Sequence, residues 1–131
     1  MSDRNTPFRD GELFPVPIAT KTEIFGGHMV AGNATGYAVL ASAVAAQVTL
    51  GVSDGYVDNS DGAAGDAVAL VRRGKSWCFA NFGGDAVTQA EVGKTCYVAD
   101  SQTVAKTNNA GVRPVAGKVM GVDADGVWVL I

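Results

Sequence analysis

The sequence predicts an all-β protein, a single small β-sandwich or jelly-roll-like barrel with an extended N-terminal arm. Three observations predict this fold. The chain has 131 residues, which is a common size for one domain. Its 17 glycines separate short Val-rich runs along the whole length, and glycine suits tight turns but weakens a helix interior by about 1 kcal/mol relative to alanine. Apolar residues make up 47% of the chain, which is enough for one buried core.

Residues 1–20 predict an extended arm, because their composition differs from the rest. Pro7, Pro15 and Pro17 lack the N–H group that a central strand needs, and each favours an extended residue before it. We expect the arm to lie on a neighbouring subunit, with a frayed terminus as the alternative. The expected anchors are Phe8, Arg9, Leu13, Phe14 and, just beyond the arm, Phe25. For Phe8, Phe14 and Phe25 a place in the internal core is the alternative.

Residues 21–131 predict the barrel or sandwich domain, because short apolar runs alternate there with turn residues. The expected strands are 23–25, 28–31, 37–40, 47–53, 67–72, 76–80, 95–99, 102–105, 114–122 and 127–131. A short helical turn competes with strand over residues 41–46. Thr88 and Glu91 have the spacing of a capping box, which predicts one helical turn between them.

Turn residues predict how some of these strands connect. Asp125-Gly126 between apolar runs indicates a hairpin, and Asp100-Ser101 indicates a second one. Arg73-Gly74-Lys75 predicts either a hairpin or a sharply kinked strand. We expect both Trp77 and Trp128 to lie in the core.

The charge pattern argues against nucleic acid and membrane as partners. The net charge is -3, and the longest cationic run is the pair Arg72-Arg73, whereas phosphate binding needs clustered cations. The first six residues are polar, unlike a signal peptide, and glycines interrupt the longest uncharged stretch. Cys78 and Cys96 are expected to stay free in a reducing cytosol, with a disulfide as the alternative if two strands align them.

No motif in the sequence predicts catalysis, a metal site or a cofactor. Arg73-Gly74-Lys75-Ser76 resembles the end of a phosphate-binding loop, but Ala69 stands where the first glycine belongs, and a strand pattern follows instead of a helix. The chain has one histidine and two cysteines, too few for a structural zinc site. We therefore expect no enzyme and no cofactor.

Several short motifs follow one another in an order that resembles a known family. They are Phe8-Arg9-Asp10-Gly11-Glu12, Phe25-Gly26-Gly27-His28-Met29-Val30-Ala31, Val71-Arg72-Arg73-Gly74, Gly93-Lys94-Thr95-Cys96-Tyr97-Val98-Ala99-Asp100 and Asp125-Gly126-Val127-Trp128-Val129. This order resembles the capsid cement, or head-decoration, proteins of tailed bacteriophages, particularly those of Mu-like phages.

The resemblance implies a structural virion protein without catalytic residues. Such a protein is made in the bacterial cytoplasm and then binds the outer capsid surface. There it forms a dimer or trimer and bridges neighbouring copies of the major capsid protein. One oligomer that contacts several capsid subunits gains effective concentration, so its avidity exceeds each single affinity.

Two other function classes remain as alternatives. A carbohydrate-binding module needs exposed aromatic platforms, for which Tyr37, Tyr56 and Trp77 are candidates. A small hydrolase would assemble its site from scattered residues around the lone imidazole of His28.

Overall fold

A computed structural model describes residues 1–7 and 11–131. In these two ranges nearly all regular structure is strand, which confirms the all-β, sandwich-like fold. The elements are β1 (Leu13–Pro17), β2 (Thr22–Ile24), β3 (Met29–Gly32), β4 (Ala38–Leu40), β5 (Val48–Ser53), β6 (Val57–Asn59), β7 (Val68–Arg72), β8 (Ser76–Asn81), the 3-10 helix η1 (Gln89–Glu91), β9 (Thr95–Asp100), β10 (Thr103–Ala105), β11 (Val115–Asp123) and β12 (Gly126–Leu130).

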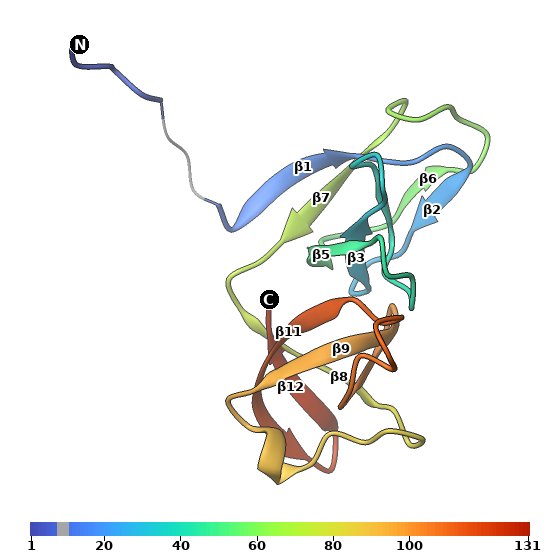
Figure 1. Ribbon diagram of the computed structural model, residues 1–131. Coiled ribbons are helices and arrows are strands. Elements are labelled where there is room, and N and C mark those ends of the chain that lie inside the picture. Colours follow the sequence, from blue (N-terminus) through green and yellow to red (C-terminus); the bar gives the residue numbers. More distant parts are fainter. Residues whose placement is uncertain (8–10) are drawn as a thin grey trace.

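The strands divide between two stacked bodies (Figure 1). The N-terminal sheet has the order β1-β7-β5-β3-β4, and a parallel bridge between Ile18 and Ala38 joins its two ends. The short pair β2-β6 lies beside it. The C-terminal barrel is closed in the order β10-β8-β12-β11-β9, and it contains the two predicted hairpins, β9-β10 and β11-β12. The sequence predicted most of these strands, but it missed β1 and β6, and it did not predict how the strands divide between sheets.

Strand β3 belongs to both cores of the molecule, because all four of its residues are buried. Val30 packs into the N-terminal core, with residues such as Ile18 and Val71. Met29 points the other way and packs into the C-terminal core, with residues such as Val119. The two bodies are therefore joined by a shared hydrophobic layer, to which Val52 of the neighbouring strand β5 also contributes on the C-terminal side.

Residues 73–75 connect the two bodies, so of the two alternatives expected at this position the hairpin is wrong. β7 before them lies in the N-terminal sheet, and β8 after them lies in the C-terminal barrel. Gly74 has φ +82° and donates its N–H to the carbonyl oxygen of Ile131 at 2.7 Å. The local pattern indicated a sharp change of direction correctly. It contained no information about which sheet the next strand would join.

The arm is shorter than the predicted 1–20, because residues 13–17 form β1 and pair with β7 along its whole length. Ile18 donates its N–H to Ala67 O, and Arg73 donates to Glu12 O, both at 2.9 Å. Alternate amides of β1 therefore face β7, and Pro15 and Pro17 occupy the positions in between, whose nitrogens face away. Proline is tolerated in an edge strand for this reason. The name arm is kept for the chain before β1, of which residues 1–7 and 11–12 are described and residues 1–7 are exposed.

The two tryptophans lie on opposite faces of the barrel wall, so the prediction that both are in the core is wrong for Trp128. Val127 and Val129 take the inward positions of β12, and alternation turns Trp128 outward, with 38% of its surface exposed. Its indole N–H donates to Asp123 Oδ2 at 2.9 Å. Trp77 is half-buried against the C-terminal core.

Several glycines allow close contacts between strands, among them one in each body at a register shift. A Cβ atom on Gly51 of β5 would overlap the carbonyl oxygen of Arg72, and one on Gly117 of β11 would overlap that of Leu130. Each glycine lies at a register shift between its strand and a neighbour. Such irregularities bend a strand, and here they let the strands curve around a small core.

Candidate interaction surface

An exposed apolar face covers the edge strand β1 of the N-terminal sheet and its neighbour β7. Cross-strand partners share a face, and the register pairs Pro15 with Leu70 and Pro17 with Val68. Leu70 is 46% exposed, Val68 45% and Leu13, on the same side of β1, 41%. We call these five residues the β1–β7 apolar face.

A groove of about 240 Å³ adjoins this face. It is lined by Asp54, Gly55, Tyr56, Val57, Val68 and Leu70. The Phe25 ring lies 5.5 Å from the Tyr56 ring and 5.7 Å from the His28 ring, measured between centroids. The apolar face therefore continues through the groove into an aromatic cluster on the loops around β2 and β6.

Charged groups flank the groove and fix its walls. The Tyr56 hydroxyl donates to Glu23 Oε1 at 2.7 Å. This hydrogen bond is the main reason that the pKa of Tyr56 rises to about 12, with smaller contributions from desolvation and from the charges of Asp58 and Glu23. Arg72 donates from Nε and Nη2 to Asp54 Oδ1, at 3.0 and 2.8 Å. These intramolecular hydrogen bonds therefore fix the orientation of the Tyr56 ring and of the Arg72 and Asp54 side chains at the rim of the groove.

The structure brings two of the predicted anchors to this surface. Leu13 lies on the apolar face, and Phe25 lies in the aromatic cluster with 41% of its surface exposed. Phe14 is a correction: it is half-buried against the N-terminal core, because alternation along β1 turns it inward. Phe8 and Arg9 lie outside the described residues.

Sequence reasoning missed Val68 and Leu70, and it considered Tyr56 only as part of a carbohydrate platform. A signal for the first two was present, because Val68-Ala69-Leu70-Val71 is apolar without interruption. A strand with one solvent-exposed face normally alternates apolar and polar residues. An uninterrupted run of apolar residues therefore indicates that both faces of the strand are apolar. The buried face holds Ala69 and Val71, and the other face is the exposed one.

The lone histidine joins the two bodies. His28 Nδ1 lies 2.9 Å from Ser101 Oγ, and the N–H of Met29 donates to Ser101 O at 2.8 Å. Within the described ranges no carboxylate forms a hydrogen bond with this imidazole, so the orienting third group of a hydrolytic triad has no counterpart there. The same ranges hold no cluster of three or more His, Cys, Asp or Glu side chains arranged for a metal ion.

The three aromatic residues considered for carbohydrate binding do not form one platform. Tyr56 borders the groove of the N-terminal sheet, whereas Trp77 packs against the C-terminal core and Tyr37 is half-buried. Among the described elements, no helix is long and apolar enough to span a membrane.

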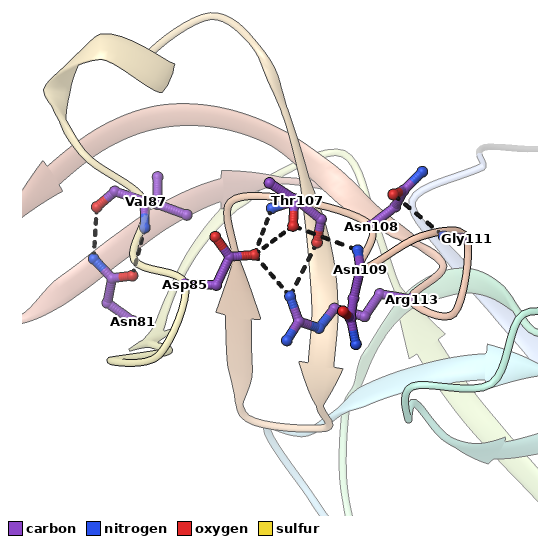
Figure 2. Close-up of polar contacts among 8 residues, drawn as sticks. All are labelled: Asn81, Asp85, Val87, Thr107, Asn108, Asn109, Gly111 and Arg113. Atoms are coloured by element: carbon purple, nitrogen blue, oxygen red, sulfur yellow. Dashed lines mark hydrogen bonds and ion pairs between the residues drawn. The ribbon is translucent and has the colours of Figure 1, made fainter.

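A second polar cluster lies in the loops of the C-terminal barrel (Figure 2). Asp85 Oδ2 accepts hydrogen bonds from the N–H and hydroxyl of Thr107 and from Arg113 Nη1, at 3.0, 2.5 and 2.8 Å. These bonds, that of the Thr107 hydroxyl first, lower the pKa of Asp85 although partial burial opposes the shift. The Arg113 guanidinium also lies 5.0 Å from the Phe82 ring centroid. Asp85 lies in the loop after β8, and Thr107 and Arg113 lie in the loop between β10 and β11. The cluster therefore fixes the positions of these two loops relative to each other.

Comparison with known proteins identifies no relative: no protein-family model, curated protein or solved structure matches this chain. The residues themselves therefore define the class. It is an all-β protein with two joined cores and an exposed apolar face beside an extended N-terminal segment.

Proposed function

We propose that this protein is a structural virion protein that binds the outside of a phage head and stabilises it by bridging neighbouring major capsid subunits. The observation that carries the proposal is the β1–β7 apolar face with its adjoining groove. Single exposed apolar residues are normal, but a contiguous apolar patch rimmed by polar groups is typical of a protein-binding site. The choice of the major capsid protein as the partner comes from the order of sequence motifs, which resembles that of capsid cement proteins.

The groove suits a protein side chain better than a small molecule. Pockets for drug-sized ligands measure roughly 300–1,000 Å³, and this groove holds about 240 Å³. One or two apolar side chains of a capsid loop would fill it against Leu70 and Tyr56. The neutral Tyr56 ring and the paired Arg72–Asp54 rim leave little uncompensated charge to desolvate.

Docking on the face is favoured over addition of a strand to the sheet edge. Strand addition needs unpaired N–H and C=O groups along the edge. Pro15 and Pro17 remove two donors from the free edge of β1, so a partner strand would lose those hydrogen bonds. We therefore expect binding through side-chain burial, and not through a continued β-sheet.

One such contact is weak, which is why bridging matters. Burying the exposed parts of Leu13, Val68 and Leu70 contributes about 1 kcal/mol each. Association itself costs at least about 4 kcal/mol in lost freedom. Residues 1–7 lie away from both bodies (Figure 1), and in this proposal they contact a second capsid subunit while the apolar face binds the first. Linked contacts of this kind bind through avidity.

The first test compares two aspartate substitutions at equally exposed apolar positions. Leu70 is 46% exposed on the apolar face, and Val112 is 45% exposed on a loop of the barrel. We expect Leu70→Asp to weaken co-sedimentation with expanded shells from the encoding phage at least tenfold, and Val112→Asp to bind like the wild type. The proposal fails if the wild type does not bind shells, or if Leu70→Asp binds as well as Val112→Asp.

The second test concerns the arm. Deletion must stop before β1, so the variant lacks residues 1–11 and keeps every β1–β7 pair. We expect an unchanged circular dichroism spectrum and weaker shell binding. If the truncated protein binds shells as well as the full chain, the arm is only a tail.

A further inference from the structure

The outer wall of the C-terminal barrel carries a second apolar face, separate from the one above. Register places Cys78, Trp128 and Gly121 in one row across β8, β12 and β11, with Ser76, Leu130 and Lys118 in the next row. Cross-strand partners point to the same side. Trp128 and Leu130 are each 38% exposed, Met120 is 50% exposed, and the thiol of Cys78 is exposed too. We call this surface the barrel face.

Two opposite charges mark the two ends of this face. Lys118 lies in the middle of β11 beside Leu130, the last residue of β12, and Asp123 lies at the last position of β11 beside Gly126, the first residue of β12. Five residues along a strand separate them by about 15 Å. Asp123 is held in place, because its carboxylate accepts from the Trp128 indole at 2.9 Å and from the Asp125 N–H at 2.8 Å. The row between the two charges holds Cys78 and Trp128 and no charged side chain.

This pattern is self-complementary under a two-fold rotation. Consider an axis that lies in the plane of the face and crosses the strands along the row of Cys78 and Trp128. The rotation reverses direction along the strands but keeps the position across them. Lys118 of one copy then meets Asp123 of the second copy, twice over, while Trp128 meets Trp128. A two-fold interface requires this arrangement, in which one patch complements itself.

We propose that the barrel face pairs with the same face of a second copy to form a two-fold dimer. Its centre is apolar and aromatic and its charges are at the rim, which is the usual anatomy of a specific interface. The β1–β7 apolar face lies on the other body and stays free in such a dimer (Figure 1). The dimer therefore does not depend on the proposed capsid binding.

The deciding experiment exchanges the two charges between copies. In Lys118→Asp the new aspartate faces Asp123 of the second copy, and in Asp123→Lys the new lysine faces Lys118. Like charges across an interface oppose binding, so we expect each variant to raise the dimer Kd at least tenfold, which is about 1.4 kcal/mol. A mixture of the two variants restores both opposite-charge contacts and should form heterodimers.

Sedimentation equilibrium measures the result against the chain mass of 13.4 kDa. The wild type and the mixture should have twice this mass at concentrations where each single variant is monomeric. Recovery in the mixture also shows that both variants are folded. The proposal is overturned if the wild type is monomeric up to its solubility limit, if Lys118→Asp leaves the mass unchanged, or if the mixture stays monomeric.

Thiol crosslinking locates the axis independently. Sheets that pack face to face lie about 10 Å apart, too far for a disulfide but within reach of a short bis-maleimide. Cys78 is exposed and Cys96 is fully buried, so the reagent can react only with Cys78. We expect a crosslinked dimer in the wild type and none in Cys78→Ser. An uncrosslinked wild type under conditions where it sediments as a dimer would overturn the placement of the axis.

Discussion

The two bodies of this protein have similar sheets but close them differently. The C-terminal barrel closes through ladders between all five neighbouring pairs of strands, whereas a single bridge between Ile18 and Ala38 joins the ends of the N-terminal sheet. A closed barrel has no free edge. The N-terminal sheet keeps one at β1, and the chain continues from that edge into the arm. Incomplete closure therefore places the apolar face, the groove and the arm in the same body.

The difference does not make the bodies independent, because β3 contributes to both cores. The largest expected effects come from truncating its two inward side chains, Met29 toward the C-terminal core and Val30 toward the N-terminal core. Met29→Ala should lower the free energy of unfolding by about 3 kcal/mol and Val30→Ala by about 2 kcal/mol.

Both tryptophans lie in the C-terminal barrel, so their fluorescence reports that body, while circular dichroism reports all strands. For both variants we expect the two signals to change at one denaturant concentration. If Val30→Ala shifts circular dichroism but leaves the tryptophan transition in place, the bodies unfold separately and the shared core is not cooperative.

Local signals in the sequence were enough to predict most elements. The Asp125-Gly126 hairpin was predicted correctly, and so was the helical turn that Thr88 and Glu91 cap. The same signals could not divide the strands between two sheets, because a kink at residues 73–75 has the same composition whether the chain folds back or crosses over. Partner choice depends on contacts distant in sequence.

The next largest effect concerns the close contacts at Gly51 and Gly117, one in each body. A methyl group at either position would overlap a carbonyl oxygen of the adjacent strand. Overpacking of this kind costs about 1–3 kcal/mol, so we expect both alanine variants to lower the thermal midpoint by several degrees. Gly83→Ala serves as the control, because no atom lies within 4 Å of its added Cβ. Equal midpoints for all three variants would contradict the close-contact argument.

The candidate site was only partly predictable for a related reason. Phe25 and Phe14 were both expected as interface anchors, with the internal core as the alternative; Phe25 is exposed, as an anchor must be, whereas Phe14 packs against the N-terminal core. The prolines of the arm suggested a free segment, yet their spacing of two also fits an edge strand. Once Leu13–Pro17 pairs with β7, alternation decides that Phe14 is inside. The register between β1 and β7 decides that Phe14 is buried, and the sequence alone does not specify that register.

The smallest effects compare the ion pairs of the two bodies. Arg72–Asp54 in the N-terminal body and Arg113–Asp85 in the C-terminal body have the same N···O distance of 2.8 Å. The first pair's side chains are 36% and 40% exposed, and the second pair's are 11% and 23% exposed. Exposed ion pairs contribute at most about 1 kcal/mol, so Asp54→Asn should change stability by less than that.

Asp85 should instead govern part of the response to acid. Its pKa in the folded state lies below the ordinary value of 3.8, chiefly through the Thr107 hydroxyl. A carboxylate with a lowered folded pKa stabilises the native state above its unfolded pKa, and this contribution is lost as the pH falls through the folded pKa. Unfolding midpoints measured between about pH 5 and pH 1 should therefore fall less steeply for Asp85→Asn than for the wild type. An unchanged slope would mean that the Asp85 cluster contributes no more to acid stability than an exposed pair.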